Sequence, residues 1–205
     1  MSNKNENKAS ITKFLLDKAK MDLLSGIEAH KDNLIEAEIQ IGINVNLLLG
    51  IALEGIVNEI GENIVGNEWE DIETTSVITK LVIIFKLRGE AVNKGKKPFQ
   101  LFNQLISLRN KIAHPKLESI GNDVILISDN GQLVKNPTDD YILPNNEFSI
   151  YIGYEKLLEK FNINVTLKNM KEALESIRDV MKLSPNAAFS SYYNNMYEEI
   201  KKIKI

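Results

Sequence analysis

A long apolar stretch between Asn33 and Ile60 limits what this chain can fold into more than any other feature. Its later apolar residues recur at spacings of three and four, the period of an α-helix: Val45, Leu48, Leu49, Ala52, Leu53, Ile56 and Ile60. Because apolar residues occur on all sides of such a helix, we expect it to be the central and most buried one. Gly42, Gly50 and Gly55 would allow close packing of other helices or would kink it.

The first part of this stretch permits a second interpretation. Between residues 38 and 46, apolar and polar residues alternate, which is typical of a β-strand. The flanking residues have helical periodicity, however, and no partner strand lies nearby in the sequence. We therefore predict one helix from about Asn33 to Ile60, with a strand over 38–46 as the alternative.

The same periodicity predicts helices on both sides of the central one, and hence an all-α helical bundle. The predicted ranges are Ile11–Ala29, Glu68 to about Arg88, a helix that ends near Ala113, about Thr166–Lys182, and Asn186–Lys202. The last of these, which is rich in tyrosine, either packs onto the bundle or forms a dimer arm. Trp69, Phe99 and Phe102 are expected to be core residues.

A different pattern occurs in the second half of the chain. The apolar run Val124–Ile127 leads into Asp129-Asn130-Gly131 and then Leu133-Val134, which is the pattern of a β-hairpin. We therefore predict a small β-hairpin insertion at about 117–149, with helix resuming from about Tyr151.

Composition and charge exclude several classes of protein. With 43% hydrophobic residues the chain can bury a core, and we expect one helical domain over residues 10–205 after a disordered tail over 1–9. A net charge of −3 argues against broad electrostatic binding to DNA but permits a small basic site. The absence of cysteine and the presence of only two histidines argue against a metal site.

The N-terminal residues are polar and lack the apolar region of a secretion signal. No apolar run reaches the roughly 18 residues of a membrane span. We therefore expect a soluble, cytoplasmic protein that neither enters a membrane nor uses a cofactor.

The most informative candidate site lies where a predicted helix ends, near Ala113. Asn110 and His114 are four residues apart and share a face of its last turn, and the long stem of Arg109 can reach the same place. A guanidinium, an amide and an imidazole can together hold a phosphate and move a proton near neutral pH. The alternative is structural, because a histidine at a helix C-terminus can simply interact with the dipole and the free carbonyls.

Further candidates lie on both sides of this motif. The cations that could contact phosphates are Lys94, Lys96 and Lys97, which form a basic loop before the motif helix, and Lys111 within the motif. Alternatively, the basic loop is merely solvated. Glu54 and Asn58 lie one turn apart on the central helix and could support the site from there. His30 is expected to be a surface histidine, with a second catalytic imidazole as the alternative.

Arg109, Asn110 and His114 also fit the arginine, polar residue, three residues and histidine of HEPN domains. A wider run, from Ile51 to Lys116 and about a third of the chain, resembles HEPN-type bacterial proteins. The segments that carry this resemblance are Ala52-Leu53-Glu54, Val57-Asn58-Glu59-Ile60, Trp69-Glu70 and Lys94-Gly95-Lys96-Lys97-Pro98-Phe99. The resemblance implies a helical bundle that acts as a metal-independent endoribonuclease, often in a toxin–antitoxin or anti-phage system.

In such an enzyme, RNA is cut to leave a 2′,3′-cyclic phosphate and a 5′-hydroxyl. The resemblance implies that His114 is the general acid or base, that Arg109 stabilises the developing charge, and that Asn110 orients the imidazole or holds a phosphate oxygen. It also implies RNA as substrate, a homodimer with a shared site, and an antitoxin protein as a further partner. The alternative is a non-catalytic HEPN binding module, since some HEPN domains act only as partners.

Overall fold

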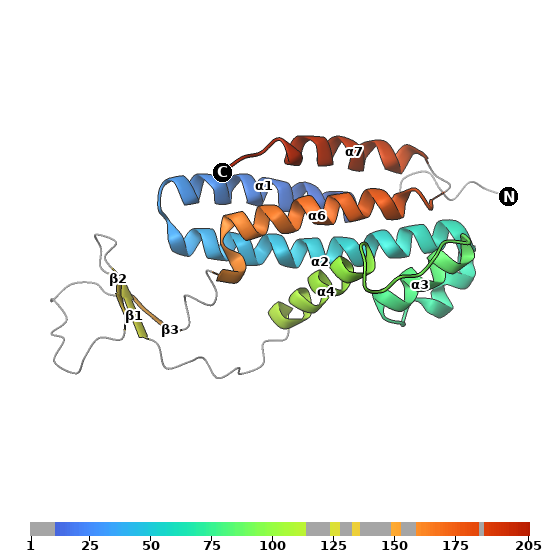
Figure 1. The fold of residues 1–205 in the computed structure, drawn as a ribbon, viewed down its shortest axis with the longest axis horizontal. Helices are drawn as coiled ribbons and strands as arrows, with labels where there is room; N and C mark the ends of the chain where they lie inside the picture. Colours follow the sequence, from blue (N-terminus) through green and yellow to red (C-terminus); the bar gives the residue numbers. More distant parts are fainter. Residues whose placement is uncertain (1–10, 114–123, 128–132, 136–148, 153–158, 185–186) are drawn as a thin grey trace.

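A computed structural model describes residues 11–113, 124–127, 133–135, 149–152, 159–184 and 187–205. Its helices are α1 (Ile11–Lys31), α2 (Ile35–Val65), the 3₁₀ helix η1 (Gly66–Ile72), α3 (Val77–Leu87), α4 (Phe99–Ala113), α6 (Ile163–Met181) and α7 (Ala187–Lys201). Figure 1 shows α1, α2 and α6 along one common axis, with α7 on one side and α3 and α4 on the other. The prediction of a helical bundle is confirmed; the predicted tail over 1–9 lies outside the described residues.

The central element is α2, since α1, α3, α4, α6 and η1 all pack against it. Its residues Val45, Leu49 and Leu53 are fully buried, as the sequence predicted. Residues 38–46 are helical throughout, so the strand alternative is wrong there. An apolar helix can bury all of its sides when neighbours surround it, and this burial outweighs a local strand-like pattern.

A layer of hydrogen-bonded amides, one of them fully buried, fixes α6 on α2. Asn46 is fully buried; its Nδ2 donates to the carbonyl of Gly42 at 2.7 Å, and its Oδ1 accepts from Asn169 Nδ2 at 2.7 Å. At Gly42 the chain comes so close that an added Cβ would collide with the carbonyl oxygen of Phe161. A buried amide must keep its partners, so this layer sets the register of the two helices.

The helix predicted from Glu68 to about Arg88 is in fact two elements. After η1, the chain turns at residues 73–76 and α3 begins, with Ser76 as its N-cap: the Ser76 side chain accepts a hydrogen bond from the Thr79 amide at 3.2 Å. Serine is a favoured N-cap residue, so this signal was available in the sequence. Trp69 is 1% exposed, which confirms it as a core residue.

The second half of the chain contains three short described strands, β1 (Val124–Ile127), β2 (Leu133–Lys135) and β3 (Ser149–Ile152). They form an antiparallel sheet in the order β2-β1-β3. This arrangement corrects the predicted two-stranded hairpin, because a third strand pairs with the free edge of β1.

Tyr151 lies in β3, so helix does not resume there; residues 159–161 are helical, and α6 begins at Ile163. The side chain of Asn162 caps α6 by accepting from the Val165 amide at 3.0 Å. The turn predicted at Asp129-Asn130-Gly131 lies outside the described residues.

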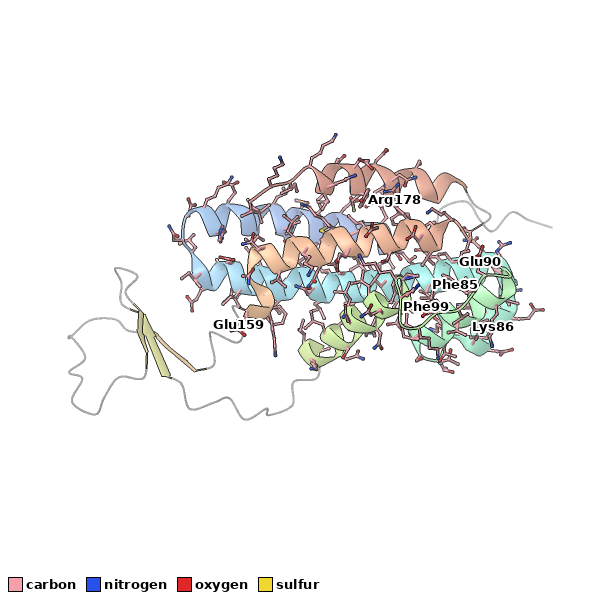
Figure 2. The ribbon with its side chains drawn as sticks, in the orientation of Figure 1. Phe85, Lys86, Glu90, Phe99, Glu159 and Arg178 are labelled. Carbon is pink, nitrogen blue, oxygen red and sulfur yellow. The ribbon has the colours of Figure 1, made fainter. Side chains whose placement is uncertain are left out.

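The tyrosine-rich last helix, α7, packs onto the bundle. The Tyr192 hydroxyl donates to Asp17 Oδ1 in α1 at 2.7 Å, and Arg178 Nε in α6 donates to Asn194 Oδ1 at 2.6 Å. Figure 2 shows Arg178 extending from α6 toward α7. The packing interpretation of this helix is therefore confirmed.

By length and composition alone, one described segment, Ile35–Ile72, could cross a membrane. The sequence analysis did not identify it, because polar residues such as Asn46 and Glu54 interrupt the apolar run. Half of its most apolar window is buried inside the bundle, as in the core helix of a soluble protein, so it is weak evidence for a membrane span.

Candidate functional site

The motif lies in α4, which is anchored near both ends. Phe99 is 2% exposed, and its ring centroid lies 4.7 Å from that of Phe85 in α3. Figure 2 labels both side chains where α3 and α4 meet. Near the other end, Leu108 and Ile112 pack against Ile39 and Phe161. Phe99 is thus a core residue, as predicted, and so is Phe102, which is fully buried.

Arg109 reaches across from α4 to α2. Its Nη2 donates to Glu54 Oε2 at 2.6 Å, and the two side chains are 23% and 34% exposed. The helices can approach this closely because Gly50, one turn before Glu54, has no side chain. A Cβ at Gly50 would lie 2.5 Å from Arg109 Cβ and 2.9 Å from Arg109 Cγ. Of the two roles predicted for Gly50, close packing is the one observed.

The ion pair leaves part of the Arg109 guanidinium unsatisfied. A guanidinium has more N–H donors than one carboxylate oxygen can accept. In the described part of the chain, Arg109 Nε is buried and has no hydrogen-bond partner. Asn110 and Lys111, which follow it, are exposed.

His114 lies outside the described residues. The site that the structure describes therefore consists of Arg109, Asn110 and Glu54, with Lys111 beside them. Arg109 and Glu54 meet at the α2–α4 junction, and Asn110 is the exposed residue that follows Arg109 in α4.

Asn58, the other candidate on α2, is bound to α3. Its Oδ1 accepts from Lys80 Nζ at 2.9 Å, and Lys80 is 1% exposed. Lys80 was not among the predicted site residues, although Val77, Leu81 and Ile84 mark the buried face of α3 and Lys80 lies beside them. A buried lysine needs hydrogen-bond partners, which is why Asn58 is held there.

The structure does not bring the basic loop to Arg109. Lys94 and Lys96 are exposed, but Lys97 Nζ lies 3.1 Å from Glu175 Oε2 and 3.5 Å from Glu172 Oε1, both in α6. The hydrogen bond with Glu175 holds the pKa of Lys97 above its ordinary value. The loop enters the first turn of α4, whereas Arg109 lies about 15 Å further along the helix axis at the usual rise per residue.

His30 is a surface histidine with a structural partner. Its Nδ1 lies 3.0 Å from Glu38 Oε2, and its side chain is 41% exposed. Glu38 is buried, and its other oxygen accepts from the Ile163 amide at 2.7 Å. This carboxylate therefore links the end of α1 to the start of α6, which agrees with the surface interpretation of His30.

Among the described residues, no group of three or more histidine, aspartate or glutamate side chains is placed to hold a metal ion. Comparisons with family models, curated proteins and solved structures found no match to this chain. The resemblance to HEPN domains therefore rests on the motif and on the segments around it.

Proposed function

We propose that this protein is a metal-independent endoribonuclease of HEPN type that acts in a toxin–antitoxin or anti-phage system. The observation that carries the proposal is the placement of Arg109. Its guanidinium is held at the α2–α4 junction by one hydrogen bond to Glu54, its side chain remains 23% exposed, and it lies next to the exposed Asn110. A partly desolvated guanidinium of this kind suits a phosphate oxyanion, because charge-assisted hydrogen bonds strengthen as water is excluded.

In the proposed reaction, a base removes the proton of the ribose 2′-hydroxyl and the 2′-oxygen attacks the adjoining phosphorus. The bond from phosphorus to the 5′-oxygen then breaks, and that oxygen takes a proton from an acid. His114 supplies the acid or base, since an imidazole changes charge near neutral pH. Arg109 stabilises the charge on the phosphoryl oxygens, and Asn110 orients the imidazole or binds a phosphate oxygen.

One motif supplies one imidazole, whereas in-line transfer requires an acid and a base on opposite sides of the phosphorus. A homodimer with its two-fold axis near the end of α4 would repeat Arg109, Asn110 and His114 in the same site. We include this dimer, and an antitoxin protein as a further partner, in the proposal.

The Arg109–Glu54 ion pair favours a second candidate, a non-catalytic HEPN binding module. In this candidate, the pair of Arg109 with Glu54 serves only to hold α4 on α2. In this case Arg109 would be a structural residue and RNA would not be cut.

Incubation of the purified protein with total RNA in EDTA separates the two candidates. The enzyme proposal expects cleavage by the wild type and by Arg88→Ala, a control that removes an exposed arginine in the cap of α3. It expects no cleavage by His114→Ala. If RNA remains intact with the wild-type protein, or is cut only after Mg²⁺ is added, the binding module or another mechanism takes its place.

A further inference from the structure

The Arg109 guanidinium makes one hydrogen bond across the α2–α4 junction, and that bond ends on Glu54. Among the described residues, no other charged group forms an ion pair with Arg109. The backbone of α4 is set by apolar contacts, including those of Phe99, Leu105 and Ile112. The position of the charged group therefore depends on α2.

Gly50 and Glu54 are one helical turn apart on the same face of α2 and act on the same arginine. Gly50 admits the first carbons of the Arg109 side chain, and Glu54 binds its far end. A side chain that is packed closely at Cβ and Cγ and hydrogen-bonded at its guanidinium has lost most of its rotamer freedom before a ligand binds. Such preorganisation lowers the cost of placing a charge against a transition state.

We propose that Glu54 is a positioning residue for Arg109: it fixes the guanidinium from α2 so that the remaining donors face the phosphate of bound RNA. This inference rests on the proposed function and adds a role for α2. Glu54 touches neither RNA nor the reacting atoms; it acts through Arg109. Because it contributes orientation rather than affinity, its removal should lower kcat more than it raises KM.

Substitutions of two carboxylates on α2 test the role. Glu54→Gln keeps the shape and removes the charge, and Glu36→Gln removes one exposed carboxylate at the start of the same helix. For Glu54→Gln we expect kcat to fall by about ten- to a hundredfold, the effect of a displaced catalytic group, with KM changed less than about threefold. Glu54→Asp keeps the charge on a shorter side chain, so its kcat should fall less than that of Glu54→Gln. The kcat of Glu36→Gln should match that of the wild type.

A second readout does not depend on cleavage. The chain contains only three arginines, so substitution of each by lysine assigns their Nε–H signals in a ¹⁵N–¹H NMR spectrum. The Nε of Arg109 is buried, and its proton should exchange slowly with water in the wild type. The bond to Glu54 is donated by Nη2, and its loss should release the guanidinium so that the Nε–H leaves its buried position more often. Exchange should therefore speed up by about ten- to a hundredfold in Glu54→Gln, with no change in Glu36→Gln.

The outcomes are distinguishable. If the wild type cuts RNA and Glu54→Gln keeps its kcat, the positioning role is refuted. It is also refuted if Glu54→Gln binds RNA more tightly and cuts faster, because Glu54 would then compete with the phosphate for Arg109. If the wild type cuts no RNA, the proposed function fails by itself, and unchanged Nε–H exchange in Glu54→Gln would separately show that Glu54 does not fix Arg109.

Discussion

Substitution of Gly50 by alanine tests the close contact on which the site depends. The new Cβ would lie 2.5 Å from Arg109 Cβ, 2.9 Å from Arg109 Cγ and 3.2 Å from the carbonyl oxygen of Leu105. Two of these neighbours belong to the fixed part of α4, so the helix itself must move away from α2. Overpacking of this kind costs about 1–3 kcal/mol.

Alanine is also the better helix former, which returns about 0.5–1 kcal/mol within a helix. The middle of each range gives a net loss of about 1.2 kcal/mol in the free energy of unfolding, or about 2–5 °C in Tm for a chain of this size. Urea unfolding followed by circular dichroism measures the difference. Gly95→Ala is the matched control, because its nearest contact would be an ordinary 3.5 Å to Asn93 Oδ1. A Gly50→Ala protein as stable as the wild type, or more so, would show that α4 does not pack this closely on α2.

Three further predictions follow from other parts of the molecule. Changing Lys94, Lys96 and Lys97 together to glutamine should weaken RNA binding and flatten its dependence on salt; an unchanged slope would mean that the basic loop is only solvated. Light scattering should give about twice the chain mass of 23.2 kDa, and mixing His114→Ala with Arg109→Ala chains should partly restore cleavage; a monomer that cuts RNA would rule out the shared site. Burial raises the pKa of Tyr193, whose hydroxyl is buried without a partner in the described chain. Stability should therefore fall as pH rises above the ordinary tyrosine value of about 10, and Tyr193→Phe should remove part of this fall without lowering stability at pH 7, as measured by urea unfolding.

Much of the bundle could be predicted because its helices bury wide apolar faces. The periodicity around Leu49, Leu53 and Ile56 indicated a central helix, and that helix is α2. The ambiguous segment 38–46 needed the tertiary structure, since only its neighbours decide whether an alternating pattern is buried on one side or on several. The break at residues 73–76 was missed because the apolar pattern continues across it, although Ser76 gave a local signal for a helix start.

The candidate site could be predicted only in part. Arg109, Asn110 and Glu54 were identified, and the structure brings Arg109 and Glu54 into contact. That Glu54 rather than Asn58 would meet Arg109 could not be read from the sequence, because both lie within one turn of the same helix and the choice depends on where α4 crosses α2. The ion pairs of Lys97 with α6 likewise join residues about 75 positions apart in the chain, beyond the reach of local patterns.

The third strand and the buried Lys80 were not predicted for a related reason. A strand as short as β3 has little periodicity of its own and forms because β1 offers a free edge. Lys80 is polar by type, and only its position beside Leu81 and Ile84 marks it as buried.

The most direct test of the account uses a short RNA that the wild-type protein cuts in EDTA, together with the same RNA carrying a single 2′-deoxy nucleotide at the cut. The account predicts a 2′,3′-cyclic phosphate and a 5′-hydroxyl from the first RNA and no cut at the modified position, because the 2′-oxygen is the nucleophile. It also predicts that Arg109→Ala slows the cut by about 10²–10⁴-fold with little change in Tm. Cleavage at the 2′-deoxy position, or cleavage by Arg109→Ala at the wild-type rate, would contradict it.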